Sequence, residues 1–186
     1  IIGGVATGAK AAARARRRDP HAEITIVERG RLLSYAGCGM PYYIQGQVHD
    51  FHELMSTPVG VIRDGTFFQN VKDIRVRNQT LAEKIDRARK TVSVVHVATG
   101  EKAEFPYDKL VLATGGIPIE PRLEGTNLNR VFRLNLPDDA LAIREAIDHG
   151  NVKRAVLIGG GLIGLETAEA LAARGLTRPR PAAMVI

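Results

Sequence analysis

The sequence predicts an α/β protein that contains a small antiparallel β-meander, and two observations support this fold class. An apolar strand, a glycine turn and a helix follow one another in residues 1–18, and the same order returns in residues 153–173. Between these two units, short β-branched segments alternate with turn residues, which is typical of a meander. The second unit breaks off almost as soon as it begins, so we expect it to be incomplete.

Composition places the chain among soluble globular proteins. Its 186 residues are 45% hydrophobic and 25% charged, which is enough to bury a sizeable core. A single cysteine excludes an internal disulfide framework and fits a reducing, cytoplasmic compartment. No apolar run approaches the roughly 20 residues that a membrane helix needs. We therefore expect a cytoplasmic protein with no membrane partner.

The net charge of +6 raises the question of nucleic acid binding. Much of the excess lies in four arginines of one segment, Arg14, Arg16, Arg17 and Arg18. No zinc-binding spacing, aromatic-rich sheet or recognition-helix pattern accompanies them. We interpret them as the solvated face of a helix and expect no nucleic acid partner. A second interpretation stays open, in which some of them attract an anionic substrate such as a nucleotide or a coenzyme phosphate.

The first unit can be read element by element. IIGG ends a strand, and residues 6–18 are rich in the helix formers alanine and arginine. Asp19-Pro20 stops this helix, because proline disfavours the helical conformation of the residue before it. EITIVE forms a second strand that ends at Glu28. Pro41 then favours a short helix start after a loop.

The remaining elements are predicted from the spacing of apolar residues and from the glycine, proline and other turn residues that separate them. We expect a helix at 59–69 and strands at 74–76, 81–86 and 91–97, with a hairpin turn at 87–90 and a further turn at 98–108. KLVLATGG predicts a buried strand that runs into a glycine turn. An amphipathic helix at 137–149 precedes a buried strand at 155–160 and a second helix at 162–175.

The glycine turn of the second unit carries the clearest ligand signal. Gly159, Gly161 and Gly164 form a full GxGxxG motif between an apolar strand and a helix. The first glycine permits the tight turn, the second lets backbone approach a pyrophosphate, and the third lets the helix pack on the strand. This context favours dinucleotide binding over a purely structural turn.

The glycine turn of the first unit is less regular, because Val5 stands between Gly3 and Gly8 where the middle glycine belongs. Glu28 lies 20 residues beyond Gly8, at a strand end where a carboxylate can accept hydrogen bonds from ribose hydroxyls. An acidic residue there favours FAD or NAD over NADP. The alternative is a glutamate at a strand end with no ligand.

Four stretches, taken in order, resemble the FAD-dependent pyridine nucleotide–disulfide oxidoreductases. They are the first glycine turn with Glu28, then SYAGCGMPYY, YDKLVLATGG and GGGLIGLE. The chain is most similar to the single-cysteine branch of coenzyme A disulfide reductases, persulfide reductases, and NADH oxidases and peroxidases. The resemblance covers residues 1 to about 176. It implies a Rossmann-like FAD/NAD(P)-binding fold of the glutathione-reductase type.

The resemblance also implies domains and binding residues. An FAD-binding domain would occupy 1–115, a connecting segment with a helix 116–150, and the start of an NAD(P)H-binding domain 151–186. NAD(P)H would be bound by the three glycines of the second turn. FAD would be bound by residues of the first turn, the strand ends and the meander: Gly3, Val5, Ala6, Gly8, Glu28, Arg29, Ala82, Ala113, Thr114 and Gly115. Ala82 would present its backbone to the adenine.

Cys38 is the predicted catalytic residue. It stands just before a helix start, where the positive end of the helix dipole favours the thiolate, and Gly37 and Gly39 would leave room for a substrate sulfur and a flavin ring. Relatives with two active-site cysteines carry the second one at the position of Tyr43, so the redox partner of Cys38 must come from outside the chain. The resemblance implies electron transfer from NAD(P)H through FAD to a mixed disulfide at Cys38, with Ser34 and Tyr42 near the thiol substrate.

Two departures limit what the resemblance implies. Gly37 stands where coenzyme A disulfide reductases carry asparagine, which leaves open whether the acceptor is coenzyme A disulfide, a persulfide, oxygen or peroxide. The tail RPRPAAMVI departs from the expected buried strand, since Pro179 and Pro181 would break it. We expect a fragment of a longer, homodimeric enzyme. The alternatives are an NADH oxidase or peroxidase with a cysteine sulfenic acid, and an inactive FAD-binding fragment.

Overall fold

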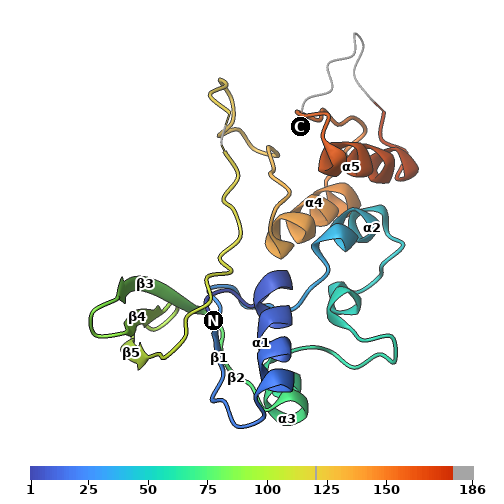
Figure 1. Ribbon diagram of the computed structural model, residues 1–186. Coiled ribbons are helices and arrows are strands. Elements are labelled where there is room, and N and C mark those ends of the chain that lie inside the picture. Colours follow the sequence, from blue (N-terminus) through green and yellow to red (C-terminus); the bar gives the residue numbers. More distant parts are fainter. Residues whose placement is uncertain (120, 178–186) are drawn as a thin grey trace. The chain divides into compact units, whose positions relative to one another are not determined.

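The computed structural model describes residues 1–119 and 121–177, and the predicted break at Pro179 and Pro181 lies outside them. The chain forms two compact units (Figure 1). The first unit comprises Ile1–Tyr35 and Met55–Ile117, and the second comprises Ala36–Leu54 and Pro118–Ile186.

The first unit is built on a parallel sheet. Strand β1 (Thr25–Val27) pairs in parallel with β2 (Arg75–Arg77), with Ile26 opposite Val76. Ile2 forms parallel bridges to both Val27 and Leu112, so the first strand of the sequence lies between β1 and the segment around Leu112. Parallel neighbours need a crossover connection. Helix α1 (Ala6–Arg18) supplies it between Ile2 and β1, with the bounds that the sequence predicts.

Small residues let α1 pack closely on this sheet. Ala9 and Ala12 are buried in a cluster that also contains Ile24, Ile26, Leu33, Phe68 and Ile74. The opposite face of α1 carries Arg14, Arg17 and Arg18, all exposed, which confirms the solvated basic face. Arg16 differs from its neighbours, because it donates to the carbonyl of Pro20 at 2.6 Å and pairs with the carboxylate of Asp73 at 3.1 Å.

The predicted meander is present as an antiparallel sheet of β3 (Thr80–Asp86), β4 (Thr91–His96) and β5 (Lys102–Pro106) (Figure 1). Val92 and Val94 of β4 pack with Val27 of the parallel sheet. The expected turn at 98–108 is wrong in its second half, where β5 pairs with β4. The sequence of β5, KAEFP, has one large apolar side chain, Phe105, which lies opposite Val92. The segment therefore lacks the alternation of apolar and polar residues that predicts a strand.

Helix α3 (Gly65–Lys72) begins later than the expected residue 59. The side chain of Asp64 accepts a hydrogen bond from the backbone N–H of Phe67 at 2.8 Å, which caps the helix and sets its start. The residues before it form a small hairpin closed by a bridge between Ser56 and Ile62.

Two expected buried strands are also corrected. In KLVLATGG, Leu112 forms a single bridge, to Ile2, and no longer strand pairing is recorded for this segment in the described chain. Both Val111 and Leu112 are exposed. In the second unit, residues 155–160 are not assigned to a strand, and the pairing recorded next to them among the described residues is a bridge between Arg154 and Thr177. The burial of a strand depends on partners that a local apolar run does not reveal.

The second unit is helical. Helix α2 (Met40–Gln45) contacts both α4 (Pro137–His149) and α5 (Leu162–Ala173), and Figure 1 shows the three helices side by side. Two short 3₁₀ turns, Gly37–Gly39 and Phe51–Met55, flank α2. Asp139 stabilises the start of α4 by accepting from the N–H groups of Asn135 and Leu136. Within the described residues, no helix is long and apolar enough to cross a membrane.

Candidate functional site

The first glycine turn has no space for a side chain at Gly3 or Gly8. Gly3 has φ +102°, and a Cβ there would lie 2.1 Å from the carbonyl oxygen of Ala113. A Cβ on Gly8 would lie 1.7 Å from the carbonyl oxygen of Gly3. These contacts bring α1 against the first strand, which is the role that first and third glycines take in dinucleotide-binding turns.

The start of α1 is open to an anion. Val5 precedes the helix and Ala6 begins it; no side chain caps this end, and the first turn has no acidic residue. Because the first N–H groups of a helix lack intrahelical acceptors and carry the positive end of its dipole, this end can bind a phosphate group.

Glu28 is tied into the same turn by both carboxylate oxygens. The N–H of Gly4 donates to Oε2 and the N–H of Gly30 donates to Oε1, each at 2.6 Å. A carboxylate offers about four acceptor sites, so two remain for further donors such as ribose hydroxyls. Both interpretations of Glu28 are therefore compatible, since it holds the turn together and keeps capacity for a ligand.

Three further predicted residues lie at this turn. The N–H of Ser34 donates to the carbonyl of Gly4 at 3.0 Å, with Ser34 itself at φ +49°. The N–H of Ala113 donates to the carbonyl of Ile2 at 2.7 Å, and the Thr114 nitrogen would lie 3.4 Å from a Cβ on Gly3. The structure thus brings the first glycine turn, Glu28, Ser34 and the Ala113–Thr114 backbone together.

The other first-unit candidates are placed less closely. Gly115 follows Thr114 at φ +69° and is exposed, as is Arg29. Ala82 lies in β3 beside a register irregularity between Ala82 and Lys84, and it packs against the buried valines of the meander. Such bulges leave backbone groups unpaired.

Helix α1 also presents a row of cations, here called the basic stripe, composed of Lys10, Arg14, Arg17 and Arg18. The spacing i, i+4, i+7, i+8 puts all four on one helix face. In the part of the chain that the structure describes, these four side chains are recorded in no ion pair. They are therefore available to an anion in solution.

Cys38 is exposed and lies in the 3₁₀ turn Gly37–Gly39 that leads into α2, with Pro41 in the first turn of that helix. The predicted helix start is confirmed. The expected role of Gly39 is wrong, because a Cβ there would lie 2.3 Å from Cδ2 of Leu54. The side chain of Leu54 fills the space that a Cβ on Gly39 would take. The carbonyl of Leu54 also accepts a hydrogen bond from the N–H of Ala36 at 2.8 Å.

The two tyrosines after Cys38 have different environments. Tyr42 is half exposed, whereas Tyr43 is buried edge-to-face against Phe51, with ring centroids 5.3 Å apart. The guanidinium of Arg144 stacks over the Tyr43 ring at 4.4 Å from its centroid. The sequence indicates only that Arg144 lies on an amphipathic helix, so this contact could not be expected from it.

The second glycine turn belongs to the same unit as Cys38. Gly159 has φ +121°, and a Cβ on Gly160 or Gly161 would meet nothing within 4 Å. Gly164 is buried on α5, whose start has no side-chain cap and no acidic residue in its first turn. This open turn has the features that allow a pyrophosphate to approach backbone.

A parallel sheet, an antiparallel meander and two glycine turns at helix starts define a Rossmann-type oxidoreductase fold. The family described as pyridine nucleotide-disulphide oxidoreductase matches residues 1–179, and the chain belongs to this family.

Among its relatives, the coenzyme A disulfide reductase of Staphylococcus haemolyticus is 37% identical over 95% of this chain and 38% of its own length. The NADH oxidase of Methanocaldococcus jannaschii is 32% identical over 95% of this chain and 38% of its own length. The structure of an NAD-dependent persulfide reductase from A. fulgidus matches with a TM-score of 0.91 and 44% identity, over 95% of this chain and 32% of that one. The chain thus spans about a third of the length of these relatives.

Proposed function

We propose that this chain is the FAD-binding and thiol-bearing part of an enzyme that passes electrons from NAD(P)H through FAD to a disulfide at Cys38. The acceptor would be coenzyme A disulfide or a related persulfide. The observation that carries the proposal is the exposure of the only cysteine, at a turn before a helix in a chain with two dinucleotide-type glycine turns. A lone cysteine is more often a buried hydrophobe.

The residues present fit both cofactors. The pyrophosphate of FAD would be bound at Gly3, Val5, Ala6 and Gly8, since this helix start is uncapped and free of acidic side chains. Glu28 would bind the ribose with its remaining acceptor sites, and the exposed backbone of Thr114 and Gly115 would face the same cofactor. Gly159, Gly161 and Gly164 would hold NAD(P)H. When bound, FAD supplies two-electron transfer between a nicotinamide and a sulfur.

The chemistry assigned to the chain's own residues is thiol–disulfide exchange. The Cys38 thiolate attacks one sulfur of the substrate disulfide, forms a mixed disulfide and expels the other sulfur as a thiolate. Two electrons then cleave the mixed disulfide, which returns Cys38 to its thiolate and releases a second thiol after protonation. One NAD(P)H is consumed for each substrate disulfide.

The basic stripe supports an anionic acceptor. Coenzyme A carries several phosphate charges, and the four cations of this stripe, which form no ion pair recorded among the described residues, would attract it. Ser34 and the half-exposed Tyr42 are the proposed substrate-side residues. A sulfenic acid cycle at Cys38 is the second candidate function, favoured by the similarity to a protein named NADH oxidase. We expect the full-length protein to be a cytoplasmic homodimer that binds neither nucleic acid nor membrane.

The test compares wild-type protein with Cys38→Ser, both loaded with FAD. NAD(P)H should bleach the flavin absorbance of both proteins at similar rates, because that step does not use the thiol. Coenzyme A disulfide should then restore the absorbance of wild type only. Restoration in Cys38→Ser at the wild-type rate would refute the assignment. Faster reoxidation by peroxide than by disulfide would favour the second candidate function.

A further inference from the structure

Helix α2, which follows Cys38, is too short to be stable without outside contacts. It has six residues, and isolated helices below about 12 residues are marginal in water. Three carbonyls in its last turn, those of Tyr42, Tyr43 and Ile44, nevertheless have hydrogen-bond partners. Tyr42 accepts from the N–H groups of Gly46, Gln47 and Val48, at 3.1, 3.0 and 3.2 Å. Tyr43 and Ile44 accept from two arginines, Arg144 at 3.1 Å and Arg174 at 3.2 Å.

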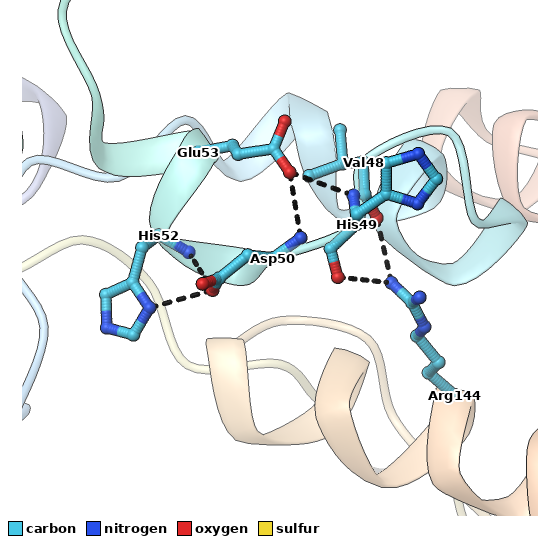
Figure 2. A network of polar contacts seen from close by, with 6 residues as sticks. All are labelled: Val48, His49, Asp50, His52, Glu53 and Arg144. Atoms are coloured by element: carbon cyan, nitrogen blue, oxygen red, sulfur yellow. Dashed lines mark hydrogen bonds and ion pairs between the residues drawn. The ribbon is translucent and has the colours of Figure 1, made fainter. Parts of the chain in front are cut away.

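Arg144 makes the larger set of these contacts. It projects from α4, and only 19% of its side chain is exposed. Besides the carbonyl of Tyr43, its Nη1 donates to the carbonyls of Val48 at 2.8 Å and His49 at 3.3 Å (Figure 2). A cation at the C-terminal end of a helix is also favoured by the helix dipole. One guanidinium therefore fixes the end of α2 and the loop behind it.

That loop returns to the turn that contains Cys38. Oε1 of Glu53 accepts from the N–H groups of His49 and Asp50, at 3.0 and 2.8 Å (Figure 2). The loop then enters the 3₁₀ turn Phe51–Met55, where Leu54 packs against Gly39 and accepts from Ala36. Arg144 is thus linked to the Cys38 turn by two routes. One runs through α2, which directly follows the turn, and the other runs through the loop at 48–54, in which Leu54 contacts Gly39 and Ala36.

We propose that Arg144 is a positioning residue for Cys38. It holds the turn Gly37–Gly39 in one conformation by bonding the carbonyls of Tyr43, Val48 and His49, so that the thiolate is aimed at its reaction partner before substrate arrives. The inference rests on the proposed function for the role of Cys38 as nucleophile. Arginine suits the task because the same planar guanidinium that bonds these carbonyls also stacks over the Tyr43 ring and lies 3.6 Å from the carboxylate of Asp148, and a lysine ammonium cannot stack in this way.

The first test needs neither cofactor nor activity. Arg144→Met removes the donors and keeps an apolar stem, and Arg87→Met makes the same change at an exposed residue of the β3–β4 turn. Amide hydrogen exchange at Gly46, Gln47 and Val48 should become about tenfold faster in Arg144→Met, because charge-assisted hydrogen bonds at this loop are lost. Exchange in Arg87→Met and in α1 of both variants should match wild type.

The second test separates positioning from general support of the fold. In flavin-loaded protein, Arg144→Met should reoxidise with disulfide about tenfold more slowly, while flavin reduction by NAD(P)H stays within about twofold of wild type. Arg144→Lys should lie between the two. Unchanged amide exchange overturns the proposal, and so does faster exchange with unchanged reoxidation. An equal fall in both half-reactions overturns it as well, because Arg144 would then support the fold alone.

The positioning role can fail while the proposed function stands, and the two failures give different results. If Cys38→Ser keeps disulfide reduction, the proposed function is wrong, and the positioning role falls with it even where the exchange result stands. If Cys38→Ser loses the reaction and Arg144→Met behaves as wild type, only the positioning role is wrong.

Discussion

Glu28 joins three segments of the first unit through its carboxylate and its backbone. Its two oxygens accept from Gly4 in the glycine turn and from Gly30 in the following loop. Its backbone N–H donates to the carbonyl of Arg77, and its backbone carbonyl accepts from the N–H of Thr80 at the start of the meander. The residue that the sequence singles out for ribose binding therefore also holds these segments of the fold together.

Glu28→Gln should lower stability as well as flavin affinity. Glutamine offers one acceptor oxygen, so either Gly4 or Gly30 would face an amide N–H₂ instead. We expect the free energy of unfolding to fall by about 1–2 kcal/mol, the range for one charge-assisted hydrogen bond that is partly buried. Urea denaturation measures it, with the exposed Glu101→Gln as control. Equal midpoints for the two variants would contradict the structural role.

Gly39 leads to a second prediction at this scale. Gly39→Ala places a methyl group against Leu54 and should cost about 1–3 kcal/mol by overpacking. Combining it with Leu54→Ala should recover part of that cost, giving a coupling energy of about 1 kcal/mol. Gly160→Ala is the control, because a Cβ there meets nothing within 4 Å. Strictly additive denaturation energies would show that Leu54 does not occupy this space.

At the scale of elements, helices α4 and α5 are joined by Asp148. Its carboxylate bonds the guanidinium of Arg174 and lies 3.6 Å from that of Arg144. The hydrogen bond from Arg174 is the main reason that the pKa of Asp148 lies below its ordinary value of 3.8. Because Arg174 also bonds the carbonyl of Ile44, the ion pair supports the end of α2 as well.

The sign of the pH dependence follows from this lowered pKa. Asp148 stabilises the folded state fully above pH 3.8 and loses that contribution as the pH falls through its folded pKa, below 3.8. Asp148→Asn should therefore be less stable than wild type at pH 6, and the difference should shrink as the pH falls below 3.8. Thermal unfolding at several pH values measures it. A difference that does not change with pH would contradict the assignment.

The elements also show what the sequence can predict. The bounds of α1 and α4 are correct because alanine-rich composition, Asp19-Pro20 and Pro137 act locally. Strand β5 and the two exposed strands are wrong because pairing and burial depend on distant partners. The glycines of both turns were found by spacing. Arg144 and Leu54 were missed, since their contacts with α2 and Gly39 join residues far apart in the sequence.

At the scale of the whole molecule, the proposed function gives the charge of +6 and the basic stripe a role in substrate capture. Raising the salt concentration should lower kcat/KM for coenzyme A disulfide, because screening weakens attraction between exposed charges. A neutral disulfide should show little change. The double variant Arg14→Gln, Arg17→Gln should lose most of the salt dependence. Equal salt sensitivity of the two substrates in steady-state assays would exclude the stripe from capture.

The proposed function requires that Cys38 carry a mixed disulfide that NAD(P)H reduces through FAD. Because Cys38 is the only cysteine, intact-mass spectrometry reports on it alone. Anaerobic treatment of flavin-loaded protein with coenzyme A disulfide should add one coenzyme A per chain, and NAD(P)H should remove it only while FAD is bound. A chain that gains no adduct, or an adduct that persists with NAD(P)H and FAD present, would contradict the account.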